Sequence, residues 1–272
     1  MIRGWPGVLL LVLILGLCFY LFYPRIEGFF VFYPDRVIEA VPSDVGLEYE
    51  DISFVAPDGT RLHGWFFPLP GNGPVMLFSH GNAGNISHRL DNIRLLLDRG
   101  IQVFIYDYRG YGRSRGRPSE KGIYMDGLAA YDYLVNRRGI DPDRITPFGR
   151  SLGAAVALET ALRRDVRSLI MESAFTSTRG MAKGMFPFQL LWPLLPRHYD
   201  NLKKIRKIDV PKLIIHGEQD EIVPFSMGQN LHEAARGPKD FLAIRGAGHN
   251  DTYVVGGKRY LQAISDFVKN QQ

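Results

Sequence analysis

From residue 47 onward, the sequence alternates between short apolar runs typical of strands and longer runs typical of helices. The strand-like runs cover residues 75–79, 102–106, 145–149, 168–172, 213–216 and 241–244, and the helix-like runs cover 87–99, 121–138, 154–164 and 259–269. Because parallel strands need long crossovers, which are usually helices, this alternation is typical of a parallel sheet covered on both faces. The sequence therefore predicts an α/β fold with a mostly parallel central sheet.

Two places depart from this pattern. Residues 47–68 hold two apolar runs on either side of Pro57, Asp58 and Gly59, and an Asp-Gly pair between such runs favours an antiparallel hairpin. Pro147 falls inside the expected strand 145–149, where a central strand normally excludes proline. Either Pro147 occupies an unpaired position or the strand has other bounds.

Composition narrows the class of protein. A chain of 272 residues with 46% hydrophobic residues is long and apolar enough for one well-packed domain, and its single cysteine, Cys18, excludes an internal disulfide framework. The net charge of +5 is too small for the dense basic stripe of a nucleic-acid-binding protein, so we expect no nucleic-acid partner. No internal repeat or low-complexity linker divides residues 26–272, which we expect to form one domain.

The N-terminal segment carries the most apolar run of the chain. Residues 8–23 read VLLLVLILGLCFYLFY without a charge, aromatic side chains stand at both ends, and Arg3 and Arg25 flank the run. This length and pattern are typical of a membrane-spanning helix. A cleaved signal peptide is disfavoured because no small-x-small site follows, and the bulky residue before Cys18 disfavours a lipoprotein site. We expect residues 1–25 to be a single-pass membrane anchor, with its orientation left open.

Residues 175–207 interrupt the alternation of strands and helices. They are too apolar for an ordinary loop, and three prolines break them too often for one long helix. We expect a small helical lid insertion packed over the domain. Its Phe, Met, Leu and Trp side chains would form either core or a pocket for an apolar ligand.

The pentapeptide GRSLG at residues 149–153 lies between an expected strand and an expected helix. Flanking glycines permit the tight turn that projects the Ser151 hydroxyl above the sheet, and the helix dipole there favours negative charge. Serine needs a base that is oriented by an acid. Asp220 and His249 each follow an expected strand and supply both, with Asp251 as a second choice for the acid.

With these residues in place, the sequence resembles the α/β-hydrolase family and, within it, membrane-anchored ABHD-type serine hydrolases. The resemblance rests on FVFYPDR, SHGNAGN, DYRGYGRS, GRSLG, HGEQDEIVP and GAGHND, and it covers nearly the whole chain after residue 25. It implies that Ser151 is the nucleophile, Asp220 the acid and His249 the base. It also implies an oxyanion hole made by the backbone N–H groups of Leu152 and Asn82, with Ala83 as the fallback for Asn82.

A serine nucleophile predicts acyl transfer to water, so we expect hydrolysis of carboxylic esters or thioesters. The family includes enzymes that remove fatty acyl groups from proteins, and the apolar insertion and anchor suit a lipid-like acyl substrate. A peptidase-like hydrolase and a catalytically silent, membrane-tethered interaction protein remain the alternatives. We expect no metal and no cofactor, because no metal-ligand spacing, phosphate loop or dinucleotide motif occurs in its required context. His80, Asp107 and Arg109 are interpreted as structural residues.

Overall fold

The computed structural model describes residues 31–183 and 198–270, together with residues 7, 10, 11, 14, 16 and 28. Contacts divide the chain into two units, Met1–Tyr33 and Pro34–Gln272. Most of the expected anchor, residues 1–25, and the middle of the expected insertion, residues 184–197, lie outside the described residues. Within the described residues, no helix combines the length and apolar character needed to cross a membrane.

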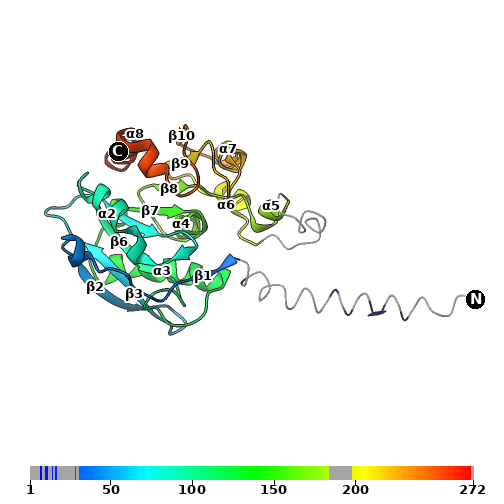
Figure 1. The fold of residues 1–272 in the computed structure, drawn as a ribbon, viewed down its shortest axis with the longest axis horizontal. Coiled ribbons are helices and arrows are strands. Elements are labelled where there is room, and N and C mark those ends of the chain that lie inside the picture. The colour runs from blue at the N-terminus through cyan, green and yellow to red at the C-terminus, as the bar shows by residue number, and fades with distance from the viewer. Residues whose placement is uncertain are drawn as a thin grey trace, which may run out of the picture. The chain divides into compact units, whose positions relative to one another are not determined.

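In the described part of the second unit, eight strands form one sheet in the order β10-β9-β8-β7-β4-β6-β3-β2 (Figure 1). Six of them are parallel: β4 (Val75–Ser79), β6 (Gln102–Asp107), β7 (Ile145–Arg150), β8 (Leu169–Glu172), β9 (Lys212–Gly217) and β10 (Lys239–Ile244). The hairpin of β2 (Glu50–Val55) and β3 (Arg61–Phe67) adds antiparallel strands at one edge, as predicted. Two short strands, β1 (Tyr33–Pro34) and β5 (Ala83–Gly84), lie outside this sheet.

Helices cover both faces of the sheet, as the alternating pattern predicts. One face is covered by α2 (Leu90–Leu97) and α8 (Thr252–Lys269), which pack against each other. The other face is covered by α3 (Glu120–Asn136), α4 (Leu152–Arg163) and α7 (Phe225–Ala234). This division follows from right-handed crossovers, because the chain moves along the sheet in one direction through α2 and in the other through α4. The short helices are η1 (Pro42–Val45), η2 (Ile86–Arg89), η3 (Pro142–Arg144), α5 (Thr178–Ala182) and α6 (Asn201–Ile205).

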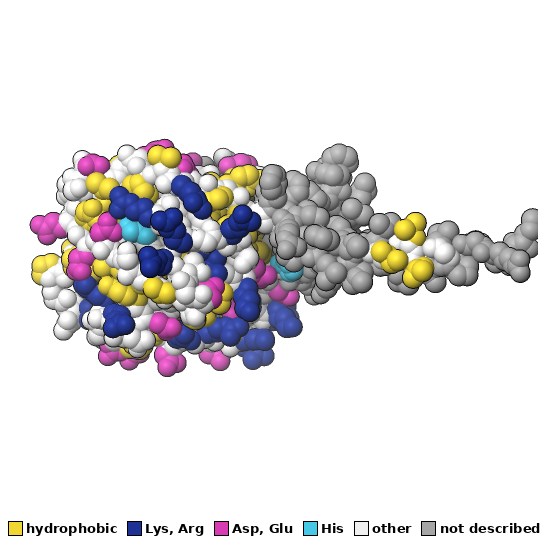
Figure 2. Space-filling view, turned by 90° about the horizontal axis from the view of Figure 1, so that it is seen from below, with side chains coloured by type: hydrophobic (Ala, Val, Ile, Leu, Met, Phe, Trp, Pro, Cys, Tyr) yellow, Lys and Arg dark blue, Asp and Glu magenta, His cyan; other side chains and the backbone are white. Residues whose placement is uncertain are grey.

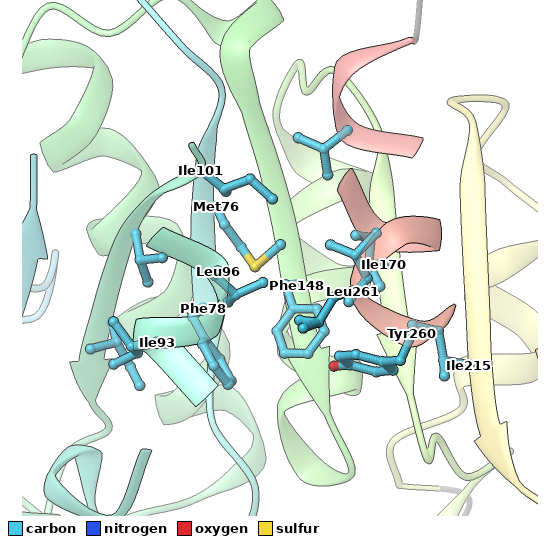
Figure 3. Close-up of a cluster of buried hydrophobic side chains, with 14 of the residues drawn as sticks. Met76, Phe78, Ile93, Leu96, Ile101, Phe148, Ile170, Ile215, Tyr260 and Leu261 are labelled. Atoms are coloured by element: carbon cyan, nitrogen blue, oxygen red, sulfur yellow. The ribbon is translucent and has the colours of Figure 1, made fainter. Parts of the chain in front are cut away.

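A core of buried apolar side chains lies between the sheet and helices α2 and α8 (Figure 3). Strand side chains such as Phe78 and Phe148 pack edge to face, with ring centroids 4.6 Å apart. All five residues of β4 are buried, because a central parallel strand is covered on both faces. This packing fixes the carboxyl ends of the parallel strands, where the loops described below begin.

The structure accommodates Pro147 inside β7. Pro147 pairs in register with Leu77 of β4, whereas the ladder between β7 and β8 begins only at the next residue, Phe148. Pro147, which has no N–H to donate, therefore lies one residue before the ladder between β7 and β8 begins. The expected strand is present as β7, and Pro147 has a register partner in β4 but none in β8.

Two helices differ from the sequence-based expectation. The closing helix begins at Thr252 rather than 259, because α8 continues through a kink at Gly257, whose φ is +47°. Helix α7 was not predicted, since Pro224 and Gly228 weaken its helical pattern. A Cβ at Gly228 would lie 2.4 Å from Nδ1 of His216, so glycine permits this helix to pack closely on β9.

The two ends of the expected insertion lie side by side. The Thr178 N–H donates to the His198 carbonyl (3.1 Å), and the Leu202 N–H donates to the Thr176 carbonyl (3.2 Å). The buried Asn201 side chain donates to the Phe175 carbonyl (2.9 Å). Residues 175–178 and 198–202, at the two ends of the expected insertion, are therefore held together by hydrogen bonds.

Charged residues of both signs occupy the described surface. On the face shown in Figure 2, Lys and Arg side chains are interspersed with Asp and Glu side chains and with apolar patches. Some cations of the described residues are paired: Lys204 contacts Glu159 at 2.8 Å and lies over the Tyr124 ring.

Candidate active site

Ser151 occupies the sharp turn between β7 and α4. Its φ of +52° and ψ of −114° lie in a region that non-glycine residues rarely adopt, and its N–H donates to the Glu172 carbonyl at 2.8 Å. Strain of this kind persists only where the surrounding structure holds it, and it occurs preferentially at functional sites. The turn places the Ser151 side chain at the carboxyl end of the sheet.

Gly149 and Gly153 are required by close packing around this turn. A Cβ at Gly149 would lie 2.1 Å from the Gly153 carbonyl oxygen, and one at Gly153 would lie 1.9 Å from the Ser79 carbonyl oxygen. Neither glycine has a positive φ, so the strained conformation belongs to Ser151 itself. The glycines of GRSLG thus bring α4 against both its own strand and the loop after β4.

The structure brings the three predicted residues of the triad together. His249 Nε2 lies 3.0 Å from Ser151 Oγ, and His249 Nδ1 lies 2.8 Å from Asp220 Oδ2. Each residue follows the carboxyl end of a different strand: Ser151 follows β7, Asp220 follows β9 and His249 follows β10. In open α/β sheets this edge is where ligands bind. The geometry expected from the sequence is present, and the catalytic roles stay a prediction.

Four donors surround the Asp220 carboxylate. Oδ1 accepts the N–H groups of Ile222 (2.9 Å) and Val223 (2.7 Å), and Oδ2 lies 3.2 Å from His216 Nε2 as well as against His249. Burial acts to raise the pKa of this carboxyl, but the hydrogen bonds from His216, His249 and Val223 outweigh it, so the pKa of Asp220 lies below its usual value. Asp220 is therefore a carboxylate.

The ionised acid fixes the protonation of its neighbour. A carboxylate only accepts hydrogen bonds, so the neutral imidazole of His249 must carry its proton on Nδ1. Its Nε2 then has a free lone pair directed at the Ser151 hydroxyl. This is the arrangement in which a histidine removes a proton from serine as a general base.

Asp251, the second choice for the acid, lies elsewhere. Its Oδ1 accepts the Gly248 N–H at 2.7 Å, and its side chain is exposed. The neighbouring Glu221 accepts the His249 backbone N–H at 3.2 Å. Both carboxylates hold the backbone of the His249 loop and leave the imidazole to Asp220.

The loop after β4 passes beside the turn at Ser151. A Cβ at Gly81 would lie 3.9 Å from the Ser151 Cβ. His80 Nδ1 donates to the Gly81 carbonyl at 2.7 Å, and burial, together with the charge of Arg89, lowers the pKa of His80 to about 3 and keeps it neutral. Because a trans peptide points its C=O and N–H in opposite directions, this bond turns the Asn82 N–H away from His80. Donation by Asn82 to an oxyanion stays a prediction.

The other predicted oxyanion donor, Leu152, is the first residue of α4. Its N–H has no partner one turn earlier, as for every helix N-terminus, and the helix dipole favours negative charge there. The fallback residue, Ala83, belongs to β5, and its carbonyl accepts a hydrogen bond from Arg89 at 2.6 Å. The Asn82 side chain accepts a hydrogen bond from the Tyr111 hydroxyl (3.0 Å).

The residues interpreted as structural make buried contacts. Arg109 forms ion pairs with Asp126 (2.7 Å) and Asp58 (2.7 Å), and Asp107 accepts the Ile86 N–H at 3.0 Å. His80 lies between aromatic rings, 4.4 Å from the Tyr108 centroid. These buried hydrogen bonds and ion pairs agree with the interpretation of Arg109 and Asp107 as structural residues.

One group of residues has the composition of a cation site. Asp35, Glu39 and His88 place one ligand atom each within 4.8 Å of one another. However, His88 Nδ1 accepts the Asn85 N–H at 3.1 Å, so neutral His88 carries its proton on Nε2, which lies 3.3 Å from Glu39. A ligating nitrogen needs a free lone pair, so this tautomer suits a hydrogen bond from Nε2 to Glu39 better than a metal.

Comparisons with known proteins identify the family to which this fold belongs. A family model described as the alpha/beta hydrolase fold matches residues 74–187. The alpha/beta hydrolase domain-containing protein WAV2 of Arabidopsis thaliana is 39% identical over 249 residues, which cover 84% of this chain and 81% of WAV2. The chain belongs to the α/β-hydrolase family. The uncharacterized protein YfhR of Escherichia coli strain K12 is also similar to this α/β hydrolase, with 33% identity over 274 residues that cover 97% of the chain and 94% of YfhR.

Solved structures show the same fold. The esterase Pf2001 of Pyrococcus furiosus superposes with a TM-score of 0.74 and 22% sequence identity, over 88% of the α/β hydrolase described here and 99% of the esterase. At this identity the similarity concerns the fold. The mostly parallel sheet and the α/β-hydrolase resemblance inferred from the sequence are thus confirmed.

Sequence reasoning missed three charged or polar residues at the site: Arg150, Glu172 and His216. Arg150 precedes the serine, Glu172 ends β8, and His216 lies four residues before Asp220. Proximity in sequence to Ser151 and Asp220 could have indicated Arg150 and His216. Glu172 had no such signal, because its contacts depend on strand order.

Proposed function

We propose that this α/β hydrolase cleaves carboxylic esters or thioesters through an acyl-enzyme on Ser151. The observation that carries the proposal is the chain of hydrogen bonds from Asp220 through His249 to Ser151, formed at a strained turn. The similarity of the fold to an esterase supports it.

The reaction follows from the tautomer of His249. Its Nε2 takes the proton from Ser151 as Oγ bonds to the substrate carbonyl carbon, and the Leu152 and Asn82 N–H groups bind the oxyanion. His249 then returns the proton to the leaving alcohol or thiol as the bond to it breaks. A water molecule, deprotonated by His249, attacks the acyl-enzyme, and the acid leaves as Ser151 regains its proton.

A fluorophosphonate probe tests this proposal directly, because it reacts with activated serines. The purified full-length protein should be labelled, and Ser151→Ala should abolish the labelling. If the wild-type protein is not labelled and turns over no ester, a tethered interaction protein becomes the better account. Labelling accompanied by cleavage of peptide substrates alone would favour the peptidase-like alternative.

We further propose that the acyl group is fatty. The apolar sequence of residues 175–207 supports this proposal, although residues 184–197 lie outside the described residues. Each CH₂ buried by a bound acyl chain contributes about 0.8 kcal/mol, or roughly a fourfold change in binding. We therefore expect kcat/KM for p-nitrophenyl esters to rise with acyl length until the binding groove is filled.

Substitutions within residues 175–207 test whether the apolar side chains there form a substrate pocket or part of the core. Phe186→Ala and Trp192→Ala should flatten the rise for long acyl esters and leave acetyl ester turnover unchanged, so the acetyl ester is the control within each variant. Should both variants lose stability while the dependence on chain length keeps its shape, these side chains form core and the fatty-acyl proposal is wrong.

We propose, from the uncharged run at residues 8–23, that the N-terminal segment anchors the protein in a membrane. Deleting residues 1–25 should release the protein into the soluble fraction of a lysate. Turnover of a soluble acetyl ester should remain within about twofold of the wild-type value, because all three residues of the triad belong to the second unit, Pro34–Gln272. Membrane association that survives the deletion would contradict the anchor proposal.

A further inference from the structure

Two oppositely charged side chains are buried directly behind the Ser151 turn. Arg150 and Glu172 are register partners in the ladder between β7 and β8, so their side chains point to the same face of the sheet. Their exposed side-chain fractions are 7% and 0%. Taking both charges out of water is costly, and a hydrophobic pair is often as stable, so their contacts suggest a role other than stability.

Arg150 contacts the loop that carries His249. Its Nη2 donates to the His249 carbonyl oxygen at 3.0 Å, and its guanidinium carbon lies 5.6 Å from the centre of the Tyr253 ring. Its Nε lies 3.4 Å from Glu172 Oε1. The rigid, planar guanidinium of Arg150 therefore links the position next to Ser151 with the backbone of His249.

Glu172 joins the same two parts of the site from the next strand. Its carbonyl oxygen accepts the Ser151 N–H, and its carboxylate accepts the hydroxyls of Thr252, the first residue of α8, and Tyr260, in the middle of that helix. Thr252 follows His249 by three residues. The loop of the base is thus held at its carbonyl by Arg150 and at its exit into α8 by Glu172.

We propose that Arg150 and Glu172 are positioning residues that set the distance between His249 Nε2 and Ser151 Oγ. The importance of this distance, across which the Ser151 proton would pass to His249, rests on the proposed function. Asp220 fixes the tautomer and the direction of the imidazole, but its hydrogen bond to His249 still permits the loop to move relative to the serine. The Arg150–Glu172 pair fixes the position of this loop relative to the turn at Ser151, because both residues also belong to the strands that support Ser151.

The first test is Arg150→Gln in the full-length protein. We expect kcat for an acetyl ester to fall by about 10- to 100-fold with KM nearly unchanged, because a shift on the order of 1 Å in a catalytic group can cost about 100-fold in rate. Arg150→Lys keeps the charge beside Glu172 but loses the forked donor, so it should recover part of the loss.

Arg138→Gln is the matched control. Arg138 also pairs with a glutamate, Glu50 (2.8 Å), and lies over an aromatic ring, Phe66 (4.4 Å), but these partners belong to β2 and β3 at one edge of the sheet. It should lower thermal stability without lowering kcat of the folded protein. An equal loss of kcat in both variants would overturn the proposal, because it would reflect a general effect of removing an ion pair.

A double substitution tests whether Arg150 acts through the base. In a His249→Ala protein, adding Arg150→Gln should change the residual rate less than about twofold, because residues that act as a unit give non-additive losses. If Arg150→Gln lowers the rate of the His249→Ala protein by the same factor as it lowers the wild-type rate, Arg150 acts on something other than His249.

A readout independent of turnover separates this inference from the proposed function. In protein labelled with ¹⁵N-histidine, the His249 Nδ1 proton should exchange with water at least about tenfold faster in folded Arg150→Gln than in the wild type, because a displaced loop opens more readily. An unchanged exchange rate overturns the inference whether or not the protein is an esterase. If Arg150→Gln does not fold, Thr252→Val removes one donor to Glu172 and should change kcat and exchange in the same directions.

Discussion

Replacing Ser151 with alanine should lower ester turnover by about 10³-fold or more, and His249→Ala should cost nearly as much, because neither nucleophile nor base works without the other. The double variant Ser151→Ala/His249→Ala should be scarcely slower than either single variant. The measurement is kcat for an acetyl ester, with the fold verified by circular dichroism. Losses that multiply in the double variant would mean that the two side chains act independently, and the 3.0 Å contact between them would have no catalytic meaning.

The second large effect concerns the acid. Asp220→Asn should lower kcat by about 10³- to 10⁴-fold, because an amide can donate to His249 Nδ1 and so stabilise the tautomer that carries its proton on Nε2. That tautomer cannot take a proton from Ser151. Asp251→Asn is the control, since an amide oxygen can still accept the Gly248 N–H, and its activity should stay close to that of the wild type. If the Asp251 variant were the slower one, the assignment of the acid would be wrong.

The same substitution has a consequence for stability at low pH. The folded pKa of Asp220 lies below the ordinary value of 3.8, so the carboxylate contributes stability above that pH and loses its contribution as the pH falls through the folded pKa. The wild-type protein should therefore lose stability on acidification below about pH 4 more steeply than Asp220→Asn. Urea unfolding of both proteins at pH 3 and pH 6 measures this difference, and parallel losses would contradict it.

Local sequence patterns were sufficient for the parallel strands and for the three residues that the structure joins by hydrogen bonds at their carboxyl ends. Strands such as Val75–Ser79 read as continuous apolar runs, and Ser151, Asp220 and His249 each follow one of them. Helix α7 escaped prediction because Gly228, which lowers helix propensity, is needed for the approach to His216. In that case tertiary packing overrode the local signal.

The contact between Arg150 and Glu172 could not be predicted for a different reason. Their contact depends on β8 lying next to β7, and nothing in the local sequence of either strand encodes that neighbour. The same holds for His216, whose contact with Asp220 depends on how the chain turns after β9. A sequence motif thus locates the residues of the proposed triad, whereas the contacts that hold them in place become visible only once strand order is known.

The order of the triad along the chain determines when the site is completed during synthesis. Ser151 and the glycines around it belong to the middle of the chain, whereas His249 follows 98 residues later and Thr252 and Tyr260 later still. A ribosome that has translated α4 has made the nucleophile without acid, base or the helix that supports the base. A nascent chain that stops before β10 therefore carries Ser151 without His249, and the proposed hydrolysis can begin only after residues 249–260 have been made.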